Sequence, residues 1–319
     1  HMMQDAIKNF PKQFEWEPQI ENGSVGDFDG FVICGMGGSA LAADILSAVD
    51  STLDAIVHRD YALPALRDLD KRLIIFSSYS GNTEEVLDAF DLAMERKDEL
   101  SVAVITTGGS LLEKAKQQGV PYIQMPDTGI QPRAALGFNL KGLLAFVNRP
   151  SLLKMAEGLS NKLADQQEEG KDLAQKLQGK LPVVYSSSRN RAVAYNWKIK
   201  LNETAKVPAF YNVVPELNHN EMTGFDVGEK AADLLGNLAF VFLTDANDNE
   251  RNQKRFEVLE KLYTDRGMVV IKKPLVGDGF EKVFKSLLLA DWTAVALAEH
   301  YGHESEQVPM VEEFKKLIA

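Results

Sequence analysis

The stretch that decides the fold is FVICGMGGSA at residues 31–40. Four apolar residues predict a short β-strand, and the glycine-rich turn after them leads into a helix. Glycine lets the backbone approach a ligand closely, and a helix N-terminus offers unpaired N–H groups with a partial positive charge. The pattern therefore predicts a strand–loop–helix unit that binds an anion, most simply phosphate. Two alternatives stay open: a bare turn without a ligand, or a dinucleotide fingerprint ending at Ala40 with Asp60 as the ribose ligand.

Further strands and helices alternate on both sides of this stretch. Strands are predicted at residues 31–34, 55–57, 73–77, 102–106 and 122–124, with helices at 40–49, 84–96 and 111–118. Such alternation is typical of βαβ units around a parallel sheet. Residues 73–76 are all apolar, as expected for a strand that is covered on both faces.

The second half of the chain repeats the pattern less clearly. A helix at 133–148 and a charged helix at 152–177, which joins the halves, are predicted first. Strands then follow at 183–185, 209–213, 238–243 and 268–271, and helices at 192–203, 251–266, 283–300 and 311–318. A chain of 319 residues has the length of about two domains. We therefore expect an α/β protein with two doubly wound parallel-sheet domains, each an αβα sandwich, at residues 1–150 and 151–319.

Composition narrows the class of protein. The net charge is 35 − 46 = −11, which argues against a general binder of nucleic acid or of anionic membranes. Cys34 is the single cysteine, so an intrachain disulfide and a structural zinc–cysteine cluster are excluded. No apolar run is long enough to cross a bilayer, and the N-terminus lacks a signal-peptide pattern. We expect a cytoplasmic protein without a metal or other cofactor.

A second Ser- and Gly-rich loop, SSYSGNTEE, lies at residues 77–85 between another predicted strand and helix. Ser78, Ser80 and Thr83 offer hydroxyl donors beside the helix N-terminus. In a doubly wound sheet this loop and the first both lie at the carboxyl edge of the strands, where ligands bind. The two loops together predict one phosphate monoester site. Helix capping by Asn82 or Thr83 is the alternative.

Three further residues stand in positions that suggest chemistry. Arg133 follows a Pro/Gly loop at a predicted helix start, where a cation is unfavourable without an anionic partner; a surface salt bridge is the alternative. Glu203 ends a helix, where the dipole would raise the pKa of its carboxyl toward that of a useful base. The alternative for Glu203 is a solvated or Lys-paired carboxylate. His219 lies among polar residues soon after a predicted strand.

A second histidine group is a weaker candidate. His300 and His303 end a long predicted helix, where a charged histidine is favourable, and with Glu304 they offer a possible metal site that no other feature supports.

Taken together, these motifs resemble the bifunctional phosphoglucose/phosphomannose isomerases, a branch of the phosphoglucose isomerase superfamily built from two sugar-isomerase (SIS) domains. The matching motifs, in chain order, are GMGGSA at 35–40, SYSGNTE at 78–84, TGG at 107–109, PRAALG at 132–137, NE at 202–203 and ELNHNE at 216–221. The stretch VPMVEEFK at 308–315 extends the match more loosely.

The resemblance implies an aldose–ketose isomerase that acts on sugar phosphates through a cis-enediolate and needs no metal. It assigns phosphate binding to six positions in the two loops: Gly37, Gly38, Ser39, Ser78, Ser80 and Thr83. It makes Arg133 the cation that stabilises the enediolate and Glu203 the base that moves a proton between C1 and C2. His219, donated by the neighbouring subunit of a homodimer, would open the sugar ring with the help of Lys315, or of the adjacent Lys316.

Two other functions remain open at this stage. A SIS-type module that senses a sugar phosphate without turnover would not need Arg133, Glu203 or His219, and such modules usually accompany a further domain that is not visible here. A nicotinamide-dependent oxidoreductase would explain residues 35–40 alone and would leave the serine cluster at 77–83 without a role.

Overall fold

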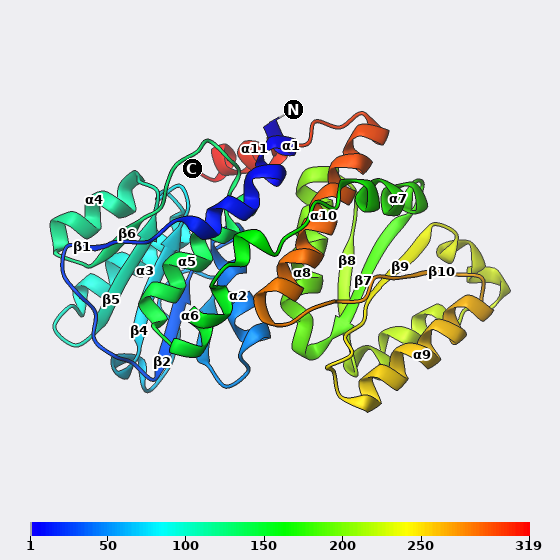
Figure 1. Cartoon of the computed structure of the whole chain (residues 1–319), viewed down its shortest axis with the longest axis horizontal. Helices are drawn as coiled ribbons and strands as arrows, with labels where there is room; N and C mark the ends of the chain where they lie inside the picture. The colour runs from blue at the N-terminus through cyan, green and yellow to red at the C-terminus, as the bar shows by residue number, and fades with distance from the viewer. Residues whose placement is uncertain (1) are drawn as a thin grey trace. The chain divides into compact units, whose positions relative to one another are not determined.

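The structure is a computed structural model that describes residues 2–319 (Figure 1). The chain forms two compact units. The N-terminal unit is Lys8–Leu163, and the C-terminal unit is Ala164–Ala319 together with the N-terminal residues up to Ile7. The chain thus passes from one unit to the other after Leu163, whereas the sequence places the domain boundary after residue 150.

The N-terminal unit is built on a six-stranded sheet in the order β1-β6-β5-β4-β2-β3. Its strands are β1 Ile20–Glu21, β2 Gly30–Cys34, β3 Asp54–His58, β4 Leu73–Ser78, β5 Ser101–Thr106 and β6 Tyr122–Gln124. All neighbours pair in parallel except β1, which is antiparallel to β6. The five predicted strands are confirmed, and only the two-residue β1, too short to show a pattern, was not predicted.

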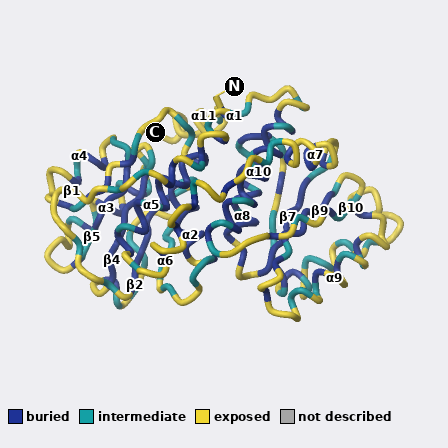
Figure 2. Tube along the Cα trace, viewed as in Figure 1, coloured by how far each residue is buried: buried dark blue, intermediate teal, exposed yellow. Residues whose placement is uncertain are grey.

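Helices cover both faces of this sheet (Figure 1). The long ones are α2 Gly38–Val49, α3 Glu84–Glu95, α4 Gly109–Gln118 and α5 Leu136–Val147. On one face α3 and α4 pack against side chains such as Ile74, Phe76 and Val104. On the other face α5 approaches β5 through Gly142, where a Cβ atom would lie 3.3 Å from Ile105. Figure 2 shows β2, β4 and β5 as a buried layer inside this unit.

Shorter elements complete the N-terminal unit and correct one prediction. They are α1 Met2–Asn9, which begins in the other unit, η1 Phe10–Glu15, η2 Leu69–Lys71, η3 Pro132–Ala134, α6 Pro150–Ala156 and η4 Leu159–Asn161. The single predicted helix at 152–177 is wrong: it is divided into α6, η4 and α7 Gln167–Leu177. Gly158 adopts a left-handed φ of 65° that ends α6, and Pro150 opens that helix instead of breaking it.

The C-terminal unit contains a four-stranded, fully parallel sheet in the order β10-β9-β7-β8. Its strands are β7 Leu181–Ser187, β8 Phe210–Val214, β9 Leu238–Leu243 and β10 Val269–Lys272. Its long helices are α8 Arg191–Lys200, α9 Glu250–Asp265, α10 Gly279–Tyr301 and α11 Pro309–Ile318. Short helical turns are η5 Ser188–Asn190, η6 Leu201–Ala205, η7 Glu216–His219, η8 Glu221–Phe225 and η9 Glu229–Leu235. All four predicted strands are confirmed.

Two kinds of packing hold this unit together. On one face, α9 places Phe256 and Tyr263 against an aromatic cluster that includes Tyr185 and Phe242. On the other face, α7, α8 and α10 pack together, and α7 comes so close to α10 that a Cβ atom at Gly170 would lie 2.4 Å from Trp292 Cβ. None of the helices within residues 2–319 has both the length and the apolar character needed to cross a membrane.

We expect Gly170→Ala to destabilise the C-terminal unit by about 1–3 kcal/mol, the usual range for overpacking a core. Backbone atoms at Thr293 and Trp292, both 2.9 Å from the added methyl group, cannot rotate away. This clash should outweigh the gain in helix propensity, which is roughly 1 kcal/mol. Urea unfolding followed by tryptophan fluorescence measures the change.

Gly224→Ala is the matched control, because a Cβ atom there meets nothing within 4 Å. A Gly170→Ala protein as stable as the wild type would contradict the close α7–α10 contact.

Candidate active site

The two predicted anion loops of the N-terminal unit lie side by side in the structure. β2 is flanked by β3 on one side and β4 on the other, so the chain order reverses between β2 and β4. Ligands of doubly wound sheets bind at such a switch point, at the carboxyl ends of the strands. Here the backbone N–H of Tyr79, in the second loop, donates a 2.9 Å hydrogen bond to Ser39 Oγ in the first. Ser77 Oγ donates to the carbonyl oxygen of Ser39 at 3.3 Å.

Three hydroxyl groups of these loops, those of Ser39, Ser80 and Thr83, can each donate a proton to a ligand. Because Ser39 Oγ accepts from Tyr79, its own proton is available for a ligand. Ser78 is buried; its Oγ accepts from the Gly81 N–H at 2.9 Å and lies 2.7 Å from Thr83 Oγ1. When Ser78 donates to Thr83, the half-buried Thr83 hydroxyl is left to donate to an anion. The exposed Ser80 accepts from Asn82 N at 3.1 Å and likewise keeps its proton.

A third loop supports the second. Gly81 has a left-handed φ of 75°, and a Cβ atom on it would lie 1.8 Å from the carbonyl oxygen of Gly108. The N–H and Oγ1 of Thr107 both donate to the carbonyl oxygen of Tyr79, at 3.1 and 2.5 Å. The TGG motif at residues 107–109 therefore supports the conformation of the second loop, residues 77–85, through these contacts.

The capping alternative for the second loop holds for the position of Thr83 but not for a side-chain cap by Thr83 or Asn82 on α3. Thr83 occupies the N-cap position of α3, but its side chain makes no capping hydrogen bond and pairs with Ser78 instead. Asn82 caps a different helix: its Oδ1 accepts from Ser110 N, in the first turn of α4, at 3.0 Å.

Arg133 lies in the short turn η3, and only 3% of its surface is exposed. The predicted helix at 133–148 therefore begins later, at Leu136. Gly38, at the start of α2, touches this turn: a Cβ atom there would lie 2.6 Å from the carbonyl carbon of Pro132 and 2.9 Å from Arg133 N. Burial of Arg133 contradicts a salt bridge on the surface. The Gly38 contact places the Arg133 backbone directly against the N-terminus of α2.

One polar residue that sequence reasoning missed joins these parts. Asn139, on α5, is buried and donates through Nδ2 to the Ser39 carbonyl and to Ser77 Oγ, both at 3.3 Å. The available signal was a single amide in the segment LGFNLKGLLAFV, in which Lys141 is the one other polar side chain. Buried amides need hydrogen-bond partners, so such a residue predicts a polar contact inside the core.

Glu203 lies on η6, a π-helical segment that continues α8. The predicted helix at 192–203 thus changes to a wider spiral at Leu201, which turns the following side chains relative to a regular α-helix. The segment ends where Lys206 adopts a left-handed φ of 56° and donates through Nζ to the Glu203 carbonyl at 3.2 Å. Glu203 is half-buried, and π-helical turns of this kind are frequent at functional sites.

His219 ends the turn η7, and the motif around it is anchored while His219 itself is exposed. Leu217 is fully buried, and Asn218 Oδ1 accepts from Arg255 at 3.2 Å. Glu221 accepts from Asn212 Nδ2 at 3.0 Å and from the hydroxyl of Tyr185. The flanking residues of ELNHNE therefore hold the turn, and His219 is the member presented to solvent.

Lys315 and Lys316 are exposed on α11, where Lys315 Nζ lies 3.3 Å from Glu312 Oε1. Lys315, His219 and Glu203 lie on three different elements, α11, η7 and η6. The structure therefore gathers the predicted phosphate loops and Arg133 within one unit, and leaves these three groups on separate segments of the other.

The metal alternative at the end of α10 does not fit the structure. His303 Nδ1 is hydrogen-bonded to the Ala205 carbonyl at 2.7 Å. The Glu304 carboxylate accepts from the N–H groups of Glu306 and Gln307, at 2.8 and 2.6 Å. These groups serve the loop that follows α10. In the part of the chain that the structure describes, no group of three or more His, Cys, Asp or Glu side chains is placed to hold a metal ion.

The C-terminal sheet has a switch point of its own, between β7 and β9, and it is filled by protein groups. Asp245 Oδ2 lies 2.8 Å from Lys282 Nζ and accepts from Asn190 at 2.9 Å, while Ser187 donates to Asp248 at 2.8 Å. Burial alone would raise the pKa of Asp245, but Lys282 and the other donors hold it below its usual range. Burial raises the pKa of Asp248. Carboxylates at this position oppose a second phosphate site.

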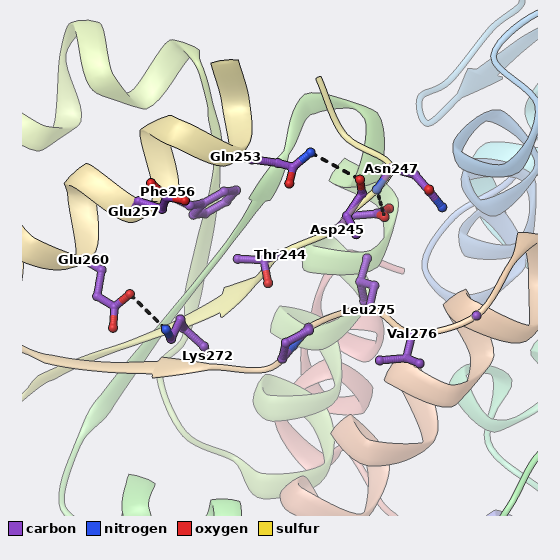
Figure 3. Close-up of a pocket in the computed structure, with 13 residues that line it drawn as sticks. Thr244, Asp245, Asn247, Gln253, Phe256, Glu257, Glu260, Lys272, Leu275 and Val276 are labelled. Atoms are coloured by element: carbon purple, nitrogen blue, oxygen red, sulfur yellow. Dashed lines mark hydrogen bonds and ion pairs between the residues drawn. The ribbon is translucent and has the colours of Figure 1, made fainter. Parts of the chain in front are cut away.

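A pocket of about 480 Å³ lies beside this second switch point (Figure 3). Figure 3 shows Thr244 and Asn247 on one side, Leu275 and Val276 on another, and the ion pair of Glu260 with Lys272, 3.2 Å apart, at one end. None of the predicted site residues lines this pocket.

Comparison with known proteins gives the family. Residues 166–318 match the model of the "Bacterial phospho-glucose isomerase C-terminal SIS domain". The chain is 35% identical to a bifunctional phosphoglucose/phosphomannose isomerase from Aquifex aeolicus, over 98% of this chain and 96% of that protein. It is 34% identical to the one from Caldicellulosiruptor bescii, over 99% of both.

The chain belongs to the bifunctional phosphoglucose/phosphomannose isomerase family. Among solved structures, a hypothetical protein from Thermus thermophilus superposes with a TM-score of 0.70 at 19% identity, covering 100% of this chain and 86% of that one. This likeness supports the fold, an α/β architecture with parallel-sheet cores of the SIS type. The family resemblance and the predicted fold class are thereby confirmed.

We expect Thr83→Val to weaken binding of inorganic phosphate about tenfold, or roughly 1.4 kcal/mol, the range for one hydrogen bond to a charged group. Valine keeps the shape of Thr83 but removes its hydroxyl, which also ends the hydrogen bond between Ser78 and Thr83. Thr83→Ser, which keeps the hydroxyl, is the control and should bind as the wild type does. Calorimetric titration measures both, and equal affinity of the valine variant would show that Thr83 does not contact the anion.

Proposed function

We propose that the protein interconverts glucose 6-phosphate and mannose 6-phosphate with fructose 6-phosphate. The observation that carries the proposal is the buried Arg133, whose backbone lies against the N-terminus of α2, where the first hydroxyl-bearing loop meets the second. Phosphate needs hydrogen-bond donors at a positive helix end, and an enediolate needs a fixed cation close to that phosphate. The names of the relatives, which are phosphoglucose/phosphomannose isomerases, support the same reaction.

The phosphate end of the substrate is assigned to the N-terminal unit. Ser39, Ser80 and Thr83 donate their hydroxyl protons, and the backbone at Gly37 and Gly38 offers the unpaired N–H groups of the α2 N-terminus. Ser78 does not contact the phosphate directly in this proposal, because it is buried. It accepts from Gly81 and donates to Thr83, and so orients the Thr83 hydroxyl toward the phosphate.

The reacting end uses a base and a cation. Glu203 removes the proton from C2 of the open-chain aldose, and the electron pair forms the C1–C2 double bond of a cis-enediolate. Arg133 balances the negative charge on the oxygens. Glu203 then returns the proton to C1, and the hydroxyl proton moves from O2 to O1, which completes the ketose. No metal ion takes part in this proposal, because Arg133 supplies the cation.

One base can serve both aldoses, which differ only in configuration at C2. The open-chain intermediate must then turn so that either of its faces is presented to Glu203. Anchoring through a freely rotating phosphate group permits such a turn, since the hydroxyls of Ser39, Ser80 and Thr83 do not fix the carbon chain.

Ring opening is assigned to His219 and Lys315. His219 would protonate the ring oxygen in the site of a neighbouring subunit of a homodimer, and its exposure at the end of η7 supports a role outside its own chain's core. The exposed α11 would carry Lys315 to the same sugar, and Lys316 is its alternative.

We expect Glu203→Gln to lower kcat by at least about 10³-fold with both aldoses, close to 4 kcal/mol of barrier, because general acid–base catalysis contributes roughly 10²–10⁴-fold. KM should change little, since the phosphate loops are intact. A coupled assay that starts from fructose 6-phosphate and detects both products measures the two reactions together.

Glu229→Gln, in the exposed turn η9, is the matched control and should leave kcat unchanged. Loss of one reaction alone would require a second base. If the wild type binds the sugar phosphates but shows no turnover, the protein is a sensor and not an isomerase.

Mixing two inactive variants tests the assigned dimer. Glu203→Gln and His219→Ala should each be inactive alone, but a heterodimer of the two contains one site with both groups intact if His219 acts across the interface. A statistical mixture then recovers about a quarter of wild-type activity, since half the dimers are mixed and half of their sites are complete. Co-expression with two affinity tags provides the mixture. No recovery beyond the single variants would place His219 in its own chain's site.

A further inference from the structure

Gln13 is a buried amide at the start of the N-terminal unit that no motif singles out. It lies on η1, and only 5% of its surface is exposed. Its Nε2 donates to the carbonyl oxygen of Ala134 at 2.8 Å, and its Oε1 accepts from the N–H of Phe138 at 3.2 Å. A carbonyl and an N–H as partners fix the orientation of the amide without ambiguity.

These two partners flank the junction between the Arg133 turn and α5. The turn η3 covers only Pro132–Ala134, and Ala135, with ψ of 19°, separates it from α5. Alanine has no side chain to cap α5, so the first N–H groups of the helix need a partner from elsewhere. Gln13 supplies that partner across more than a hundred residues of sequence, and at the same time holds the Ala134 carbonyl.

The η3 turn also contacts the backbone of α2. A Cβ atom at Gly38 would lie 2.7 Å from the carbonyl oxygen of Pro132, so the turn rests on the backbone of α2. On the Gln13 side, a Cβ atom at Gly137 would lie 2.7 Å from Gln13 Cβ. Glycine at both positions permits two close contacts: α2 against the Pro132–Arg133 turn, and the first turn of α5 against Gln13.

We propose that Gln13 is a positioning residue for Arg133. Its two hydrogen bonds fix the position of the η3 turn, and with it Arg133, relative to the phosphate loops. Gln13 itself reaches no substrate in this account, and it acts only through the turn. The inference rests on the proposed function, in which Arg133 stabilises the enediolate.

A purely structural role makes a different prediction. If Gln13 only caps α5, its loss lowers the stability of the unit and leaves kcat of the folded protein unchanged. If it positions Arg133, its loss displaces a group that acts mainly in the transition state, so kcat falls while KM, set largely by the phosphate loops, stays nearly constant.

The experiment is a double-mutant cycle between Gln13 and Arg133, with kinetics measured on folded protein. We expect Gln13→Ala to lower kcat about 10- to 100-fold, as small misplacements of a reacting group do, with KM changed less than about threefold. In an Arg133→Ala background the same substitution should lower kcat less than about twofold further, because the group it positions is gone.

Gln166→Ala is the matched control. Gln166 Nε2 also donates to a distant backbone carbonyl, that of Lys285 at 2.6 Å, but in the C-terminal unit. It should lower stability without changing kcat.

Two further variants keep the test decisive if Gln13→Ala fails to fold. Gln13→Met fills the same volume without hydrogen bonds and should show the same loss of kcat. Gln13→Glu loses the donor to Ala134 at neutral pH but regains it when protonated. Its kcat relative to wild type should therefore rise as the pH falls from about 8 to about 5.5, toward the range in which a buried carboxyl takes up a proton.

The inference is overturned if folded Gln13→Ala or Gln13→Met keeps kcat within about twofold of the wild type, or if the effects of Gln13 and Arg133 multiply. A different outcome would refute the proposed function instead: Arg133→Ala itself retaining turnover. The kcat of Arg133→Ala alone therefore shows whether the arginine matters to the reaction, and the Gln13 variants show whether Gln13 positions it.

Discussion

The backbone contact between Gly38 and the Pro132–Arg133 turn is the constraint on which the N-terminal unit's site depends. With any side chain at position 38, a Cβ atom would lie 2.6 Å from the Pro132 carbonyl carbon, so the turn could not rest on the N-terminus of α2. That contact holds the backbone of the buried Arg133 against the helix end that is assigned to phosphate. The hydrogen bond from Tyr79 N to Ser39 Oγ then brings the second loop to the same place. The residues assigned to phosphate binding and the arginine assigned to the enediolate are thus held by the same backbone contacts.

The two sheets use the same topological position in opposite ways. In the N-terminal unit, the carboxyl ends of β2 and β4 carry the two hydroxyl-bearing loops that lead into α2 and α3. In the C-terminal unit, the Lys282–Asp245 ion pair lies at the switch point between β7 and β9, and Ser187, at the end of β7, is hydrogen-bonded to Asp248. The weak repeat between the halves is therefore a repeat of fold. The residues assigned to chemistry in the C-terminal unit are Glu203 on η6, His219 on η7 and Lys315 on α11.

Sequence reasoning was reliable where a single local pattern decides the structure. Apolar runs located every strand except β1, and the Gly/Ser loops after β2 and β4 were placed correctly because their strands share one sheet edge. It was less reliable where tertiary contacts decide. Periodicity cannot show that the helix containing Glu203 widens into a π-turn, that Arg133 lies in a separate turn before α5, or that Gly158 ends α6. The roles of Asn139 and Gln13 depend on partners far away in the sequence, and no local pattern encodes them.

A crystal structure with a phosphorylated sugar acid, whose planar carboxylate imitates the enediolate, tests the central claim most directly. The account predicts that the phosphate lies within hydrogen-bond distance of the hydroxyls of Ser39, Ser80 and Thr83, and that the carboxylate is bound by the Arg133 guanidinium. A phosphate bound elsewhere, for instance in the pocket beside β9 and β10, or a carboxylate without contact to Arg133, would contradict it.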